Sequence, residues 1–405
     1  VASPHSVRAD MKKYLGLIFL MVLPFASNSR EAILDSEERY NKQAVSLADQ
    51  VWRNAELGYQ EFKSSQLLQE FLSNEGFEVQ SGVDGIDTAF VATAGAGSPT
   101  IAILAEFDAL PGLSQDAVPF RQPVEAGKPG HACGHHLFGA ASVTSGALLA
   151  SWLAEKNIPG TVKVVGTPAE EGGSGKVYLA RAGVFSDVDV VLHWHPSDVN
   201  SAAPYSTTAN KSGRFTFTGK AAHAASSPDQ GRSALDGVEA MNFIVNMMRE
   251  HIPQESRIHY IITNGGDAPN IVPETAQVYY YVRHPDKAMV VELFNKVVNV
   301  AKSAAMGTET QVNIEVMHGN YPVLPNYILS KIVDKNLRVL GGIEYDELET
   351  RFAERIIESF DKPRNPLGSE KTIQPFEFRQ GMGSTDVGDV SWLVPTAGFS
   401  IATWV

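Results

Sequence analysis

Residues 161–171 have the sequence Thr-Val-Lys-Val-Val-Gly-Thr-Pro-Ala-Glu-Glu, an apolar run that ends at Glu170 and Glu171. The run has the length and composition of a buried strand. Two similar apolar runs occupy 101–104 and 188–192, and a long helix rich in small residues is predicted over 138–156. Strands that alternate with helices indicate an α/β sheet, and open α/β sheets carry their sites at the carboxyl ends of the strands. We therefore expect the two glutamates to lie at a functional site.

A second pattern begins at about residue 210. Strands and helices are predicted there in the order βαββαβ, which is the order of a ferredoxin-like unit. We interpret this segment as a smaller domain inserted into the first. The chain then returns to the first sheet with helices predicted over 325–340 and 345–359. The inserted elements are expected at 214–218, 234–251, 257–263, 276–283, 285–306 and 310–317.

The composition of the 405 residues is ordinary for a globular protein of more than one domain, with 43% apolar and 20% charged residues. The formal net charge is −13, and the sequence contains no Lys/Arg run that would make a basic face. We therefore expect that the protein does not bind nucleic acid. A single cysteine cannot form an internal disulfide.

The first 29 residues resemble upstream sequence followed by a signal peptide. Met11 begins a short basic segment, residues 14–25 are almost wholly apolar, and small residues follow as far as Ser29. The apolar stretch is short for a membrane-spanning helix. We expect a secreted or periplasmic protein without a stable membrane anchor; the alternative is a buried helix or a retained anchor.

Residues 130–136 have the sequence Gly-His-Ala-Cys-Gly-His-His and hold the single cysteine of the chain, Cys133. Cys133 and His135 are two residues apart, a spacing that turns both side chains to one side of extended or loop backbone. The neighbouring glycines permit a tight loop. A thiolate with imidazoles suits zinc-type metals. The alternative for a lone cysteine is a small buried apolar residue.

Further candidate residues follow the predicted strands. One carboxylate of the pair Glu170 and Glu171 can bind a metal while the other accepts a proton. His193 and His195 follow the third apolar run, and only one of them is needed. His223 lies among small residues, where a histidine can donate a hydrogen bond to an oxyanion. The alternatives are a solvated acidic pair and structural or exposed histidines.

Seven motifs in this order resemble the aminoacylase/carboxypeptidase-type metallopeptidase family, in its amidohydrolase branch. That branch contains hippurate hydrolase, the plant auxin-conjugate hydrolases and the aminobenzoyl-glutamate hydrolase subunits, and the resemblance is greatest to the B-type member of the last group. Seven ordered motifs are far more specific than any one of them. The matching segments are 105–111, 130–135, 168–173, 194–196, 219–227, 269–273 and 383–392.

The resemblance implies an α/β fold of two domains. A zinc-peptidase-like catalytic domain, with a mixed sheet flanked by helices, would occupy 30–208 and 321–405. An inserted ferredoxin-like α+β domain, which serves for dimerisation and as a lid, would occupy 209–320. The implied partner is therefore a second copy of the chain, bound through the inserted domain.

The resemblance also implies a centre of two divalent metal ions, which we expect to be zinc or manganese, with cobalt as a further candidate. Carried over position by position, the implied metal ligands are Cys133, His135, Glu171 and His195. His195 fits better than His193 because the relatives share Trp-His-Pro. His136 stands where the family usually has Asp or Asn, and we expect it to support the residues around the metal ligands rather than to bind metal itself.

The implied reaction is hydrolysis of the amide bond of an N-acyl or aminobenzoyl amino acid by a metal-activated water. Glu170 would be the general base, and His223 would reach the site of the partner subunit and stabilise the oxyanion. Asn270 and Arg283 would lie near the substrate carboxylate.

One family feature has no counterpart in this sequence. The family carries a further histidine ligand after the segment 384–390, whereas no histidine follows His318 here. Two alternatives therefore stay open. One is an inactive or fragmentary relative, truncated at the C-terminus, that acts only as a binding protein. The other is a hydrolase that uses Cys133 as a nucleophile.

Overall fold

The computed structural model describes residues 27–405, with side chains from residue 38 onward. Most of the expected signal peptide, at 11–26, lies outside the described residues. The chain forms two compact units. Unit 1 contains the described residues up to Tyr205 together with Leu324–Arg379 and Asp389–Val405, and unit 2 contains Ser206–Val323 and Gln380–Gly388.

Unit 1 is built on a six-stranded mixed sheet in the order β1-β2-β4-β3-β5-β12. Neighbouring strands from β4 through β3 and β5 to β12 run parallel, whereas β1 and β2 form an antiparallel edge. The mixed α/β sheet predicted from the sequence is thus confirmed. The strands are β1 Glu78–Ser81, β2 Phe90–Ala96, β3 Thr100–Ala105, β4 Gly160–Gly166, β5 Val190–Ser197 and β12 Thr396–Ala402.

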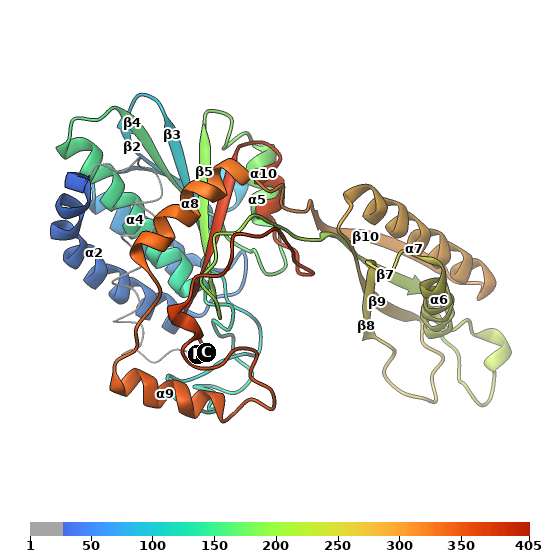
Figure 1. Ribbon diagram of the computed structural model, residues 1–405. Helices are drawn as coiled ribbons and strands as arrows, with labels where there is room; N and C mark the ends of the chain where they lie inside the picture. Colours follow the sequence, from blue (N-terminus) through green and yellow to red (C-terminus); the bar gives the residue numbers. More distant parts are fainter. Residues whose placement is uncertain (1–26) are drawn as a thin grey trace. The chain divides into compact units, whose positions relative to one another are not determined.

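Helix α4 is the core helix of unit 1. It packs against β3, β4 and β5, and α2 lies along it (Figure 1). Gly146 lies so close to Val164 of β4 that a Cβ at this position would clash, so the small side chain permits the close approach. By length and apolar composition α4 resembles a membrane span, but 78% of that stretch is buried. The helices of unit 1 are α2 Ser27–Asn54, α3 Phe62–Asn74, α4 His135–Glu155, α5 Gly175–Arg181, α8 Tyr327–Leu340 and α9 Glu347–Ile357. The short helix α10 Val387–Ser391 includes the last residues of unit 2 and the first of the final segment of unit 1.

Two differences from the predicted elements affect the site. The strand predicted to end at residue 192 continues to Ser197, so His193 and His195 lie within β5 and share one of its faces. The helix predicted to begin at residue 138 begins at His135, which places this histidine in its first turn. Small side chains such as the alanines of β2 carry little strand signal, and β1, β2, α5 and β12 were not predicted.

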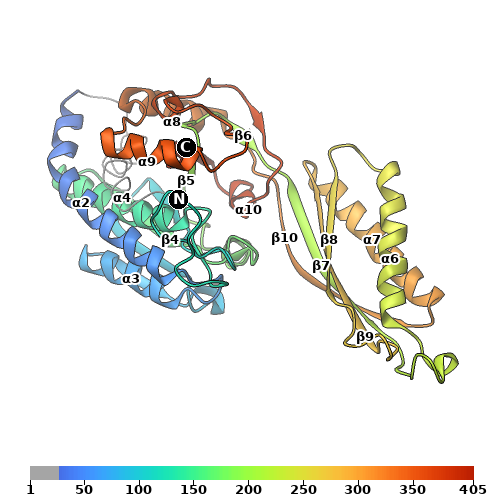
Figure 2. The same cartoon turned by 90° about the horizontal axis from the view of Figure 1, so that it is seen from below.

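Unit 2 has the predicted ferredoxin-like order βαββαβ, which is thus confirmed. Its antiparallel sheet has the order β10-β7-β9-β8, and both helices cover the same face of it (Figure 2). Phe215, Phe217 and Tyr280 of the sheet belong to one buried cluster with Leu293 and Phe294 of α7. The elements are β7 Ala209–Thr218, α6 Ala234–Met248, β8 Arg257–Asn264, β9 Thr275–His284, α7 Lys287–Gly307 and β10 Gln311–Asn320. The short strands β6 Tyr205–Ser206 and β11 Arg379–Gln380 pair with each other.

Candidate metal centre

The loop that carries Cys133 is fixed by the glycine next to it. Gly134 has a φ of +87°, which favours glycine, and it precedes the first residue of α4. A Cβ on Gly134 would lie 2.8 Å from the Cβ of Pro196 in β5. The loop can therefore lie directly on the strand that carries His195.

His135 is fully buried and held by a carboxylate. Its Nδ1 lies 2.8 Å from Oδ1 of Asp108, and Oδ2 of Asp108 accepts a hydrogen bond of 2.9 Å from the backbone N–H of Glu171. Burial opposes a charge on the ring, but Asp108, Cys133 and Glu106 together raise the pKa of His135 well above its usual value. Since Asp108 engages Nδ1, the atom available to a metal ion is Nε2.

His195 and His193 share one face of β5 but have different partners. His195 Nδ1 lies 2.6 Å from the carbonyl oxygen of Pro196, and its Nε2 lies 3.5 Å from Sγ of Cys133. His193 Nε2 lies 3.4 Å from the hydroxyl of Tyr205, and its ring packs on Gly398. His195 is therefore the histidine of this pair that reaches the cysteine.

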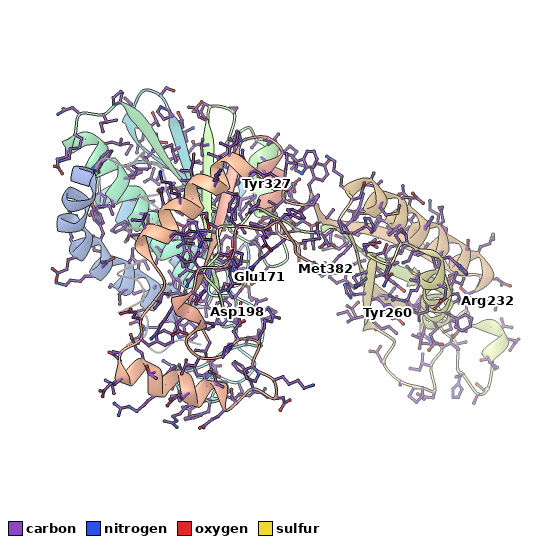
Figure 3. All side chains as sticks on the ribbon, viewed as in Figure 1. Glu171, Asp198, Arg232, Tyr260, Tyr327 and Met382 are labelled. Atoms are coloured by element: carbon purple, nitrogen blue, oxygen red, sulfur yellow. The ribbon has the colours of Figure 1, made fainter. Side chains whose placement is uncertain are left out.

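The loop after β4 brings in the two glutamates. Its residue Ala169 has a φ of +58°, and the backbone N–H of Ala169 donates a hydrogen bond of 2.8 Å to the buried carboxylate of Glu61. Oε1 of Glu171, a residue labelled in Figure 3, lies 4.0 Å from Nε2 of His135. Glu170 belongs to the group of ligand atoms around His135 that also contains Glu106.

Two groups of ligand atoms meet at His135. Within each group the atoms lie within 4.8 Å of one another, one group being Cys133, His135 and His195, and the other Glu106, His135 and Glu170. Three buried ligand atoms, one each on Glu106 (Oε2), His135 (Nε2) and Glu171 (Oε1), have no hydrogen-bond partner among the described residues. Sulfur, nitrogen and oxygen donors at this separation suit a divalent transition metal. The residues present therefore fit a metal centre.

The environment of Cys133 disfavours a free nucleophile. Burial raises the pKa of the Cys133 thiol to about 11, an effect to which the carboxylates of Glu171 and Glu170 contribute and which His135 opposes. A thiol with this pKa is almost wholly protonated at neutral pH, whereas cysteine nucleophiles act as thiolates. Both a nucleophile and a metal ligand need the thiolate form, and a divalent ion bound at the sulfur would supply the positive charge that favours it.

The three predicted site residues of unit 2 lie in two places. His223 pairs with Ile271 in an isolated bridge, and the next residue donates a backbone hydrogen bond of 3.0 Å to the carbonyl of Asn270. Arg283 lies at the other end of the sheet, where it pairs with Asn210 of β7 and donates a hydrogen bond of 2.7 Å to Ser384. Asn270 and Arg283 therefore do not meet within one copy of unit 2.

Glu106, Asp108 and Lys176 were not predicted as site residues. Glu106 and Asp108 directly follow β3, and acidic residues at the end of a buried strand were the available signal. Nothing in the sequence around Lys176 indicated that it would be buried beside Glu106. His136, expected to support the ligands, packs its ring against Trp52 and His131.

A mixed α/β unit with a buried cluster of thiol, imidazole and carboxylate groups, together with a ferredoxin-like unit, defines a two-domain metallohydrolase. The sequence profile of the peptidase dimerisation domain of the M20 family matches residues 205–309. The chain is 38% identical over 395 residues to the B-type subunit of p-aminobenzoyl-glutamate hydrolase of Escherichia coli, covering 91% of this chain and 81% of that protein. It is 33% identical over 385 residues to the human Xaa-Arg dipeptidase, covering 91% and 77%.

These matches confirm the resemblance: the chain belongs to the M20, aminoacylase/carboxypeptidase-type metallopeptidase family, in its amidohydrolase branch. Two solved structures share its fold. One is an aminobenzoyl-glutamate utilization protein from Klebsiella pneumoniae, with a TM-score of 0.63, 19% identity and coverage of 90% and 93%. The other is a dinuclear metal-binding peptidase of the M20 family from Bacillus subtilis, with a TM-score of 0.58, 19% identity and coverage of 90% and 89%.

Proposed function

We propose that this chain is a metal-dependent amidohydrolase that cleaves the amide bond of an N-acyl or aminobenzoyl amino acid, with p-aminobenzoyl-glutamate as the first substrate to test. The names of its relatives support the substrate class. The observation that carries the proposal is the convergence of Cys133, His135 and His195, with Glu170 and Glu171 beside them.

Each residue of the cluster has one task in this proposal. Cys133, His135, Glu171 and His195 hold two divalent ions, and Asp108 orients His135 through Nδ1. Bound ions of this kind polarise an amide carbonyl and lower the pKa of water toward neutrality. Glu170 takes the proton from the attacking water and passes it to the leaving amine.

Unit 2 supplies the remaining groups in this proposal. Arg283 and Asn270 bind the substrate carboxylate, and His223 donates a hydrogen bond to the oxyanion. Their separation within one copy supports a homodimer in which the site draws residues from both copies, with His223 serving the partner. The dimerisation domain over 205–309 supports the same arrangement. We also propose a secreted or periplasmic location, on the sequence of 11–29 alone.

The test is turnover of p-aminobenzoyl-glutamate by the full chain, with release of p-aminobenzoate followed chromatographically. Dialysis against a chelator should abolish turnover, and zinc, manganese or cobalt should restore it. About two metal ions per chain are expected. A protein that binds two ions per chain but turns over none of a panel of N-acyl amino acids and Xaa-Arg dipeptides would contradict the proposed reaction. Activity that survives the chelator and is lost to a thiol alkylator would favour the cysteine nucleophile.

A further inference from the structure

A buried ion pair lies directly beside the candidate metal centre. Glu106 follows β3 and is 1% exposed, and Lys176 in the first turn of α5 is fully buried. Nζ of Lys176 lies 2.7 Å from Oε1 of Glu106. Burial of two charges costs desolvation free energy that their attraction often does not recover, so such a pair is weak evidence for a purely stabilising role.

The second oxygen of Glu106 faces the metal-binding atom of His135. Oε2 of Glu106 lies 3.1 Å from Nε2 of His135, and neither atom has a hydrogen-bond partner among the described residues. The other ring nitrogen of His135 is engaged by Asp108. The two atoms are thus close without the geometry of a hydrogen bond, as expected of two groups aimed at a common third point.

The separation suits two ligands of one ion. Metal–nitrogen and metal–oxygen distances are about 2.0–2.2 Å, so two ligand atoms of one ion lie roughly 3–4 Å apart. The third member of this group of ligand atoms is Glu170, within 4.8 Å of the other two. Because Lys176 occupies Oε1, Glu106 presents a single oxygen to the centre.

We propose that Glu106 is a further metal ligand, bound to the ion that His135 holds, and that Lys176 fixes it as a monodentate ligand. The inference rests on the metal centre of the proposed function. It adds a fifth protein ligand, which neither the motifs nor the spacing of the sequence indicated. The lysine compensates the charge of Glu106 when no cation is bound.

The experiment compares the full wild-type chain with the double variant Glu106→Leu/Lys176→Met, which removes both charges at once at similar volume. Such exchanges of a buried ion pair for apolar residues usually preserve the fold. The matched control is Asp334→Leu/Arg338→Met, which removes an ion pair of 2.9 Å within α8. Cobalt(II) affinity is measured by chelator competition, together with the visible spectrum of the cobalt-loaded protein.

We expect the double variant to bind the weaker cobalt ion at least about tenfold less tightly, the lower end of the loss seen when supporting groups of metal ligands are removed. Its d–d bands should change, whereas the thiolate-to-cobalt band of Cys133 should persist and the control should match the wild type. Wild-type affinity and d–d bands in the double variant would overturn the inference. A wild-type chain that binds no cobalt would instead overturn the metal centre itself.

The single variant Lys176→Met provides a second test, in which the stabilisation by added metal should change in the direction opposite to that in the double variant. It leaves the buried carboxylate of Glu106 without the ammonium group that lies beside it, so a bound cation contributes more to compensating its charge. We expect the rise in melting temperature on addition of zinc to be larger in Lys176→Met than in the wild type, and smaller in the double variant. Equal rises in all three proteins would contradict the role of Glu106 as a ligand.

Discussion

Glu170 and Glu171 are neighbours in sequence but have different surroundings. Oε1 of Glu171 is buried without a hydrogen-bond partner near Nε2 of His135, and the backbone N–H of Glu171 is tied to Asp108. Since we propose that Glu171 binds metal and that Glu170 transfers the proton, the two isosteric amide variants should lose different properties.

Glu170→Gln should lower kcat by about 10²- to 10⁴-fold, the usual contribution of a general base, with metal content unchanged. Glu171→Gln is the matched variant and should lower metal content as well as activity. Steady-state kinetics with elemental analysis of both proteins check this. If Glu170→Gln loses metal while Glu171→Gln keeps its full metal content, the roles of metal ligand and general base belong to the opposite residues.

Glu61 gives the fold a predictable pH dependence. Burial, with a contribution from Asp108, raises the pKa of its carboxyl from 4.5 to about 7, while the hydrogen bonds from Ala169 and Thr88 oppose the shift. The folded chain therefore binds this proton more tightly than the unfolded chain. The associated stability is present below pH 4.5 and is lost as the pH rises through 7, by an amount on the order of 3 kcal/mol.

In Glu61→Gln the side chain can still accept from Ala169 and can donate to Thr88, but it does not titrate. The free energy of unfolding of this variant, relative to the wild type, should increase between pH 5 and pH 8. Denaturant unfolding at several pH values measures it, with the exposed Glu70→Gln as control. A difference between variant and wild type that is constant over this range would show that Glu61 does not titrate as described.

At the scale of single residues, the sequence alone indicated the four proposed ligands but not Asp108 and Glu106 beside them. Cys133 and His135 are conspicuous because a lone cysteine stands among histidines and glycines. Asp108 and Glu106 act through contacts with residues about 30 to 70 positions further along the chain. Local sequence carries no information on such contacts, so these residues could be found only from the folded chain.

Among the elements, the connection from the loop of Cys133 into α4 is constrained in two ways at Gly134. Gly134 combines a left-handed φ with a close approach to Pro196. Gly112 has a φ of +72° with no atom within 4 Å of a Cβ at that position. Both glycines therefore need the left-handed conformation, but only Gly134 also needs the space that a Cβ would fill next to Pro196.

Both Gly134→Ala and Gly112→Ala should lower the free energy of unfolding by about 1 kcal/mol for the left-handed conformation. Gly134→Ala should lower it by roughly 1–3 kcal/mol more, because the added methyl group displaces the loop from β5. Thermal unfolding and zinc affinity are the measurements, and zinc affinity should fall in Gly134→Ala alone. Equal effects of the two variants would show that the contact with Pro196 does not set the loop.

The elements of unit 2 were predictable because apolar residues alternate along its strands and two long helices separate them. In unit 1, β12 has the sequence Thr-Ala-Gly-Phe-Ser-Ile-Ala, whose small residues hide a strand. It pairs in parallel with β5, with Ser400 opposite His195. Partners that are about 200 residues apart cannot be assigned from local pattern, which is why the strand order required the structure.

For the whole molecule, the proposed homodimer makes a complementation prediction. Chains with His223→Ala and chains with Glu170→Gln should each be nearly inactive. If His223 serves the site of the partner, a mixed dimer contains one intact site. Co-expression in equal amounts should then restore about a quarter of wild-type activity, because half of the dimers are mixed and each has one working site. Activity no higher than that of the separate variants would place His223 in the site of its own chain.

The central claim is that the sulfur of Cys133, the imidazoles of His135 and His195 and the carboxylate of Glu171 bind the same metal centre. X-ray absorption at the zinc edge of the zinc-loaded full chain tests it most directly. We expect a sulfur scatterer at about 2.3 Å together with nitrogen or oxygen scatterers at about 2.0–2.1 Å, and loss of the sulfur shell in Cys133→Ser. A spectrum of bound zinc with nitrogen and oxygen scatterers alone in the wild-type chain would contradict it.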